Sequence, residues 1–202
     1  MVASLQRPRL TPEEYLALEE SSPIRHEYVD GEIYAMAGGT DDHPDDHNAI
    51  ALNCASILRA HLRGSGCRAF ISDVKTQLDA LNIYYYPDVF VTCDERDQAN
   101  RKLKCYPCLI IEVLSDSTEA IDRGKKFEHY QTLDSLQEYV LINQTRQRVD
   151  CFRRAEHGLW LLQGYGPGDR VRFESVGWTG EISDLYEDVK FPIPNHPIDL
   201  KL

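Results

Sequence analysis

The chain has 202 residues, of which 42% are hydrophobic and 27% charged; this composition is that of a globular protein and excludes an intrinsically disordered one. No run of about eighteen apolar residues occurs, and the N-terminus lacks a charged-then-apolar secretory pattern, so we expect no membrane span and a cytoplasmic location. A formal net charge of -11 argues against nonspecific attachment to phosphate backbones. We expect residues 1–202 to form one domain around one core.

Two helices and a hairpin are predicted at the start of the chain. Thr11 to Glu14 carry a capping-box pattern with proline at the first helical position, so a short helix should run to about Glu19. Residues 26–38 predict a hairpin whose turn is Asp30-Gly31. After a polar loop, helical spacing predicts a second helix over Asn48–Leu62.

Strands dominate the rest of the sequence. One further helix is expected over Ser117–Leu133, and a proline-rich tail closes the chain. The strand-like segments are 68–78, 83–93, 107–114, 138–143, 149–154, 159–163 and 171–173, of which the last three suggest a meander. We therefore predict an α/β (α+β) fold with a mixed central sheet flanked by helices.

The cysteines are scattered, and without a secretory signal we expect them to be reduced core residues. They are Cys54, Cys67, Cys93, Cys105, Cys108 and Cys151. Cys105 and Cys108 have CxxC spacing, but they run straight into a strand rather than opening a helix, and no second ligand pair follows. A redox or zinc role is therefore disfavoured.

One acidic residue stands inside an apolar run. In CLIIEVLSDS, residues 108–117, Glu112 interrupts a segment that predicts a strand covered on both faces. A buried carboxylate costs several kcal/mol unless a partner or a metal ion binds it. Asp88, which is 24 residues earlier, follows a proline that suits the first position of a strand. If the two strands pair, both carboxylates can point to one side of the sheet.

Two clustered carboxylates repel each other unless a divalent cation lies between them. Hard oxygen ligands suit Mg²⁺, with Mn²⁺ as a substitute, and such a site can polarise a phosphodiester and activate an attacking water.

The helix after Glu112 supplies a cation for the same edge of the sheet. Lys126 falls at the flank of the expected apolar stripe, whereas Lys125 lies nearly opposite, so Lys126 is the lysine expected to turn inward and hold the water or a phosphate oxygen. The residues of that stripe are Ala120, Gly124, Phe127 and Tyr130.

In these features the sequence resembles the Uma2 (Uma-two) family of proposed restriction endonucleases, within the PD-(D/E)XK nuclease superfamily. The matching residues are Pro87-Asp88, the strand end 112–115 and the Asp122…Lys126…Tyr130 helix. Further matches are HEYVDGEI at 26–33, His47-Asn48 and residues 136–140. The resemblance covers residues 10–155 and leaves 156–202 as a C-terminal extension.

The resemblance implies a role for each matching residue. Asp88 corresponds to the motif aspartate and Glu112 to the motif acid, and Val113 completes the expected set of metal ligands. Glu27 matches the acidic residue that many members contribute from the N-terminal segment, and we expect it to take part in catalysis. The superfamily fold is a mixed sheet flanked by helices, which agrees with the predicted elements.

The catalytic lysine departs from the superfamily pattern. The pattern places it two residues after the acid, where this chain has Leu114. In this family the lysine is thought to come from the next helix, where Lys126 lies. Without that role, Lys126 is an exposed helix lysine paired with Asp122 one turn away. Asp122 itself fits support of the site, as an ion-pair partner, better than catalysis.

Other readings remain open for the remaining candidates. Glu112 can be a strand-end acid satisfied by an arginine or by backbone amides, and Glu27 can be an ordinary residue of a half-exposed strand. The acid-rich loop favours a solvated turn over a metal site; its residues are Asp41, Asp42, His43, Asp45, Asp46 and His47. Residues 84–86, all tyrosine, favour core packing over base stacking, and the arginines of 146–154 favour a solvated edge strand over phosphate contacts or a dimer surface.

Three functions follow from these patterns. The first is a Mg²⁺-dependent DNA endonuclease that acts on double-stranded DNA, as a homodimer. The second is a nuclease-fold protein that binds nucleic acid or regulates without cleaving; it predicts that DNA is retained intact when metal is added. The third is an interaction protein, which predicts weak DNA affinity and no effect of metal on thermal stability.

Overall fold

The computed structural model describes residues 9–36 and 44–191. Its helical elements are α1 Pro12–Ser21, α2 Pro44–His61, η1 Asp79–Leu81, α3 Glu95–Ala99, α4 Glu119–Ile121, the π-helical turn η2 Asp122–Lys126, α5 Phe127–Tyr130, η3 Glu156–Gly158, η4 Glu174–Val176 and α6 Ile182–Leu185. Its strands are β1 His26–Val29, β2 Glu32–Ala35, β3 Arg68–Ile71, β4 Lys75–Leu78, β5 Ile83–Tyr85, β6 Val89–Thr92, β7 Leu103–Lys104, β8 Pro107–Leu114, β9 Glu138–Asn143, β10 Val149–Arg154, β11 Trp160–Tyr165, β12 Arg170–Phe173 and β13 Trp178–Glu181.

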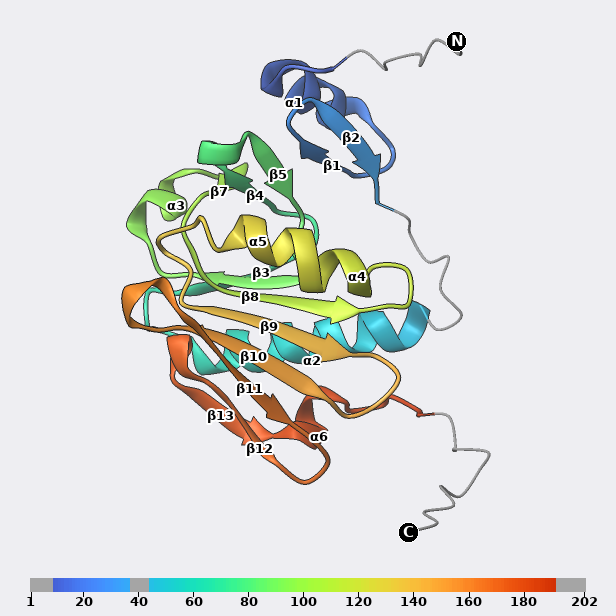
Figure 1. Ribbon diagram of the computed structural model, residues 1–202, viewed down its shortest axis with the longest axis vertical. Coiled ribbons are helices and arrows are strands. Elements are labelled where there is room, and N and C mark those ends of the chain that lie inside the picture. Colours follow the sequence, from blue (N-terminus) through green and yellow to red (C-terminus); the bar gives the residue numbers. More distant parts are fainter. Residues whose placement is uncertain (1–8, 37–43, 192–202) are drawn as a thin grey trace.

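A six-stranded mixed sheet in the order β11-β10-β9-β8-β6-β3 forms the centre of the molecule. β8 and β9 are parallel and the other neighbours antiparallel. In Figure 1, α2 lies on one face of this sheet and the α4–α5 segment on the other. Because side chains alternate along a strand, Leu109, Ile111 and Val113 belong to the α2 core and Ile110 to the α5 core. The predicted single α+β domain with a mixed sheet and flanking helices is confirmed.

Two segments predicted as single strands each divide between two sheets. The second sheet has five strands in the order β2-β1-β5-β4-β7. Residues 83–93 form β5 in this sheet and β6 in the central one, and the break falls at Pro87, which has no N–H to donate to a ladder. Residues 68–78 divide in the same way at a turn between β3 and β4. Asp88 therefore lies where the chain passes from one sheet to the other.

The N-terminal elements form as predicted. Thr11 Oγ1 accepts from Glu14 N at 3.3 Å and Thr11 N donates to Glu14 Oε2 at 2.8 Å, which completes the capping box of α1. The turn between β1 and β2 has positive φ at Asp30 (45°) and Gly31 (94°), as a type I′ hairpin requires.

The C-terminal region differs from the expected meander. β10 lies between β9 and β11, so the expectation that this arginine-rich segment is a solvated edge strand is wrong. Arg154 donates to three main-chain carbonyls after α5, and Arg153 is paired with the buried Glu138. β12 and β13 form a separate two-stranded sheet that packs with α6 against the α2 core.

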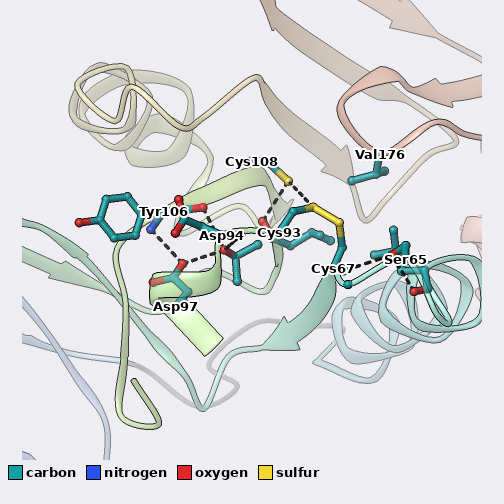
Figure 2. The surroundings of a disulfide bond; sticks show 12 residues. Ser65, Cys67, Cys93, Asp94, Asp97, Tyr106, Cys108 and Val176 are labelled. Atoms are coloured by element: carbon teal, nitrogen blue, oxygen red, sulfur yellow. Dashed lines mark hydrogen bonds between the residues drawn. A yellow bond between two sulfur atoms is a disulfide. The ribbon is translucent and has the colours of Figure 1, made fainter. Parts of the chain in front are cut away.

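The expectation that all the cysteines are reduced is also wrong. Cys67 and Cys93 form a disulfide (Figure 2). They lie one step beyond the Arg68–Thr92 pair of the β3–β6 ladder, so antiparallel pairing brings them together, which could not be foreseen without the strand partners.

Of the acid-rich loop, Asp41, Asp42 and His43 lie outside the described residues. Within the described ranges, no helix is long and apolar enough to cross a membrane.

Candidate functional site

Asp88 and Glu112 face each other across two neighbouring strands. β6 and β8 are antiparallel with Val89 opposite Ile111, so one further step places Asp88 opposite Glu112. The Glu112 side chain points to the α5 face, and Asp88 contacts His47 on the α2 side. Each carboxylate accepts from the opposite strand: Asp88 N donates to Glu112 Oε2 at 3.2 Å, and Val113 N donates to Asp88 Oδ2 at 2.8 Å. Asp88 and Glu112, which are distant in sequence, are therefore adjacent in the structure.

Glu112 is buried, with 2% of its surface exposed. Tyr130 OH donates to its Oε1 at 3.2 Å, and Lys126 Nζ lies 3.4 Å from the same oxygen. Burial raises the pKa of Glu112 well above its ordinary value; Lys126 opposes that rise, and Asp88 adds to it. The cluster therefore holds more negative charge than one ammonium neutralises.

Lys126 lies in the middle of three carboxylates. Its Nζ is 2.9 Å from Glu27 Oε1, 3.3 Å from Asp122 Oδ1 and 3.4 Å from Glu112 Oε1. Burial alone lowers the pKa of Lys126, but Glu112 and Glu27 raise it well above its ordinary value. The side chain is therefore a cation at neutral pH, which suits hydrogen-bond donation and excludes a role as general base.

Lys126 lies in a π-helical turn and its side chain is buried. The expected apolar stripe is wrong at Ala120 and Gly124, which are exposed. The buried face runs through Asp122, Lys126 and Tyr130, which follow one another at i, i+4 and i+8 and so lie on one side of the helix. The segment Asp122–Lys126 within it is the π-helical turn η2. Lys125 points to solvent, as expected. π-turns are frequent at functional sites, and this one contains the buried Lys126.

Glu27 comes to the site from the five-stranded sheet, and a second acid fixes its position. Glu19, at the end of α1, is buried and accepts from His26 N at 3.1 Å, from His26 Nδ1 at 2.8 Å and from Tyr86 OH at 2.6 Å. His26 precedes Glu27, and Tyr86 is two residues before Asp88. One carboxylate thus ties together the two segments that carry acids of the site.

His47 is a site residue that the sequence did not identify as such. It lies in the first turn of α2, and its Nε2 is 3.3 Å from Asp88 Oδ2. From the sequence, His47 was considered only as a member of the acid-rich loop and as one of the residues that match the family. His47 is seven residues before the buried Cys54, so both lie on the inner face of α2. This spacing could have predicted that His47 faces β6.

The donor set fits a hard divalent cation. Glu27 Oε1 and Asp122 Oδ1 are buried and lie 2.9 Å and 3.3 Å from Lys126 Nζ without a hydrogen bond of good geometry, so one ammonium is shared among several carboxylates. Among the described residues, no three histidine, cysteine, aspartate or glutamate side chains are already arranged around a common metal position. Mg²⁺ does not require this, because it is commonly bound through one or two carboxylates, waters and substrate phosphates.

A hollow elsewhere on the surface is separate from these residues. An open cleft of about 880 Å³ lies between α2, β13 and α6 and is lined by His61, Trp178 and Asp184 among others. None of the acids discussed above contributes to it, so the chemistry of the site does not depend on this cleft.

The mixed sheet flanked by helices, which carries the acid pair and the buried lysine at the end of two central strands, matches the fold of a protein described as a nuclease. A crystal structure of a "putative nuclease belonging to DUF820" from Anabaena variabilis has this fold, with a TM-score of 0.70 at 22% identity over 88% of this chain and 98% of that chain. The family model described as "Putative restriction endonuclease" matches residues 12–183. The chain belongs to this family, Uma2, as the sequence predicts.

Two proteins of Synechocystis sp. are similar along most of their length. The uncharacterized protein slr1290 is 40% identical over 184 residues, which is 91% of this chain and 95% of that protein. The uncharacterized protein sll1609 is 34% identical over 155 residues, covering 76% and 85% respectively. The family description and the nuclease-like fold together support a nuclease.

Proposed function

We propose that the chain is a metal-dependent endodeoxyribonuclease that hydrolyses phosphodiester bonds in double-stranded DNA. The observation that carries this proposal is the acid pair Asp88 and Glu112, held face to face by reciprocal backbone hydrogen bonds with the ammonium of Lys126 beside it. Paired acids next to a fixed cation suit phosphoryl chemistry, in which charge develops on non-bridging oxygens.

Asp88, Glu112 and the backbone carbonyl of Val113 would hold Mg²⁺, or Mn²⁺ in its place. A cation bound there supplies Lewis-acid polarisation of the phosphate and lowers the pKa of an attacking water. Tyr130 donates to Glu112 Oε1, and this hydrogen bond fixes the rotamer of the carboxylate. His47 lies against Asp88 and restrains that side chain from the α2 side.

Lys126 is proposed to hold a phosphate oxygen or to orient the water, as a hydrogen-bond donor. Glu27 and Asp122 keep its ammonium protonated and aimed at Glu112. When a phosphate enters, it can accept from the ammonium in place of one of these carboxylates. Catalysis by this lysine is electrostatic, because a lysine that stays protonated cannot take a proton from water.

The active form is proposed to be a homodimer. β11 is an edge strand of the central sheet, and Leu159, Leu161 and Leu162 on or beside it are 61%, 62% and 57% exposed. An exposed edge with large apolar side chains is a site for pairing with a second chain. A symmetric pair of active sites also suits the cutting of both strands of a duplex.

Cleavage of a supercoiled plasmid tests the proposed activity. We expect Mg²⁺- or Mn²⁺-dependent nicking by the wild type, reduced about 100-fold or more in Lys126→Ala and in Asp88→Asn. Lys125→Ala, which removes an exposed lysine next in sequence, is the matched control and should cleave like the wild type. Equal activity of the two lysine variants would reject the role of Lys126, and absence of cleavage by the wild type on all DNA forms would reject the activity.

One observation favours a second candidate, a nuclease-fold protein that binds nucleic acid without cleaving it. Leu114 occupies the usual lysine position, and in the structure Lys126 is engaged by three carboxylates rather than left open. This candidate predicts that the wild type retards DNA in a gel and leaves it intact at every metal concentration.

A further inference from the structure

Three sulfur atoms lie together at the end of β6 and β8 that is opposite to the acids. The Cys67–Cys93 disulfide bridges the start of β3 and the end of β6. The thiol of Cys108, near the start of β8, lies 3.8 Å from Cys93 Sγ. Figure 2 shows the Cys108 sulfur beside the Cys93 end of the disulfide, with Cys67 on the far side.

A β-bulge directs Cys108 toward the disulfide. In the β6–β8 ladder Val91 pairs with Leu109 and Thr92 with Pro107, so Cys108 has no partner of its own. Such an extra residue bends the strand and re-aims its side chain. The Cys108 Sγ lies 3.4 Å from Val91 O, to which it donates, and reaches Cys93 beyond it.

We propose that Cys67, Cys93 and Cys108 form a thiol–disulfide exchange site in which the Cys108 sulfur attacks Cys93 Sγ. The Cys67–Cys93 bond breaks as a Cys93–Cys108 bond forms. Cys67 leaves as a thiolate and takes up a proton from solvent, which replaces the proton that Cys108 gave up. One disulfide is consumed and one is made, so the step needs no oxidant or reductant.

The exchange transfers a cross-link from one strand pair to the next. Before it, the edge strand β3 is tied to β6; after it, β6 is tied to β8 and the start of β3 is released. Cys67 is partly exposed and Cys93 is exposed. The freed Cys67 thiol is then a surface group that disulfides and alkylating agents of low molecular mass can modify.

The resting form of the site is the thiol of Cys108. Burial, to which the Glu138 carboxylate on β9 adds, raises the pKa of Cys108 to about 11. Only the thiolate attacks a disulfide, so the exchange is slow at neutral pH, and its rate should rise about tenfold per pH unit below that pKa.

Alkylation during exchange tests the proposal in the full-length oxidised protein. We would incubate it with iodoacetamide at pH 9 without reductant, quench with acid, and map the peptides by mass spectrometry. The expected product carries an alkylated Cys67 together with a Cys93–Cys108 disulfide. Cys108→Ser should keep Cys67–Cys93 intact and unlabelled, and Cys105→Ser, which changes the other cysteine of the CxxC segment, should behave like the wild type.

Two results would overturn the exchange site. The first is a wild-type Cys67–Cys93 bond that stays intact at pH 9 while Cys108 is alkylated or unmodified. The second comes from Cys67→Ser, which leaves only Cys93 and Cys108 at this place; with glutathione disulfide it should form a Cys93–Cys108 bond, and failure to do so would show that the sulfurs cannot join. Far-UV circular dichroism of each variant verifies that the fold is retained.

Discussion

Glu112 lies in a strand among apolar neighbours, and the groups around it decide how its charge is tolerated. Lys126 and the Tyr130 hydroxyl contact one oxygen, and the Asp88 amide contacts the other. The nearby carboxylates of Asp88, Asp122 and Glu27 oppose ionisation of Glu112. An ionised Glu112 therefore lowers the stability of the fold when no further cation is bound, and a bound cation would remove this cost. This is the property expected of a metal ligand.

Glu112→Gln should raise the stability of the metal-free protein. Because the folded-state pKa of Glu112 is raised, stabilisation from its protonation is present at acidic pH and is lost as the pH rises through that pKa. Glutamine mimics the protonated form, so its thermal midpoint at pH 7 in EDTA should exceed that of the wild type.

Glu138→Gln is the matched control for this measurement. Glu138 is a buried glutamate of β9 whose oxygens are satisfied by Arg153 and Ser175. Its loss should cost about 3 kcal/mol, since it removes the buried carboxylate that pairs with the Arg153 guanidinium. A Glu112→Gln variant destabilised as much as Glu138→Gln would show that Glu112 is a structural ion-pair residue.

His129 should give the protein a pH dependence of its own. Burial lowers its pKa, and its Nδ1 is hydrogen-bonded to Tyr85 OH at 2.7 Å. The folded state therefore binds fewer protons here than the unfolded state, and stability falls as the pH drops below the ordinary histidine pKa of about 6.5. Between pH 5 and 7 the thermal midpoint of His129→Gln should vary less than that of the wild type; equal slopes would contradict this.

At the scale of elements, the sequence predicted those helices, turns and strands that are determined by interactions between residues close in sequence. The capping box of α1, the Asp30-Gly31 turn and the strand Glu138–Asn143 form where the sequence indicated. The division of residues 83–93 between two sheets and the π-turn η2 were missed, because each depends on the packing of segments distant in sequence. The spacing of Asp88 and Glu112 suggested a pair, but only the β6–β8 register places them opposite each other.

The link from α1 to both acid-bearing segments predicts a positioning effect of Glu19. Glu19→Gln loses the charge that orders His26 and Tyr86, so Glu27 and Asp88 should be held less firmly. We expect the Mg²⁺ concentration for half-maximal cleavage to rise about 10-fold or more while the maximal rate changes less. Glu20→Gln removes the neighbouring, exposed acid paired with Lys102, and it should leave that concentration unchanged.

If both glutamate variants shifted the metal dependence equally, the proposed role of Glu19 in positioning Glu27 and Asp88 would be rejected. A lower thermal midpoint in Glu19→Gln at unchanged metal dependence would assign it a purely structural role.

At the scale of the whole molecule, the acidic charge of -11 and the internal use of the β10 arginines limit where DNA can bind. Arg148, Arg153 and Arg154 contact carbonyls and carboxylates of the protein, so these side chains are not free to bind phosphates. DNA binding should therefore depend strongly on a bound cation that offsets the acids of the site.

Association through β11 should be sensitive to one charged substitution. Leu161→Lys places a charge on the exposed edge, where it opposes strand pairing between copies. Light scattering should give a dimer for the wild type and a monomer for the variant. Lys125→Ala, whose side chain lies on η2, is the control and should remain dimeric; a monomeric wild type would contradict the proposed dimer.

Calorimetric titration of Mn²⁺ into the wild type, Asp88→Asn and Glu112→Gln tests the central claim most directly, since it measures the metal site without assuming a substrate. We predict binding by the wild type that is abolished in both variants, with folding intact. Equal binding by all three proteins would place the metal elsewhere. No binding by the wild type would mean that Lys126 and the surrounding hydrogen bonds alone neutralise the acid pair, and the nuclease proposal would fall.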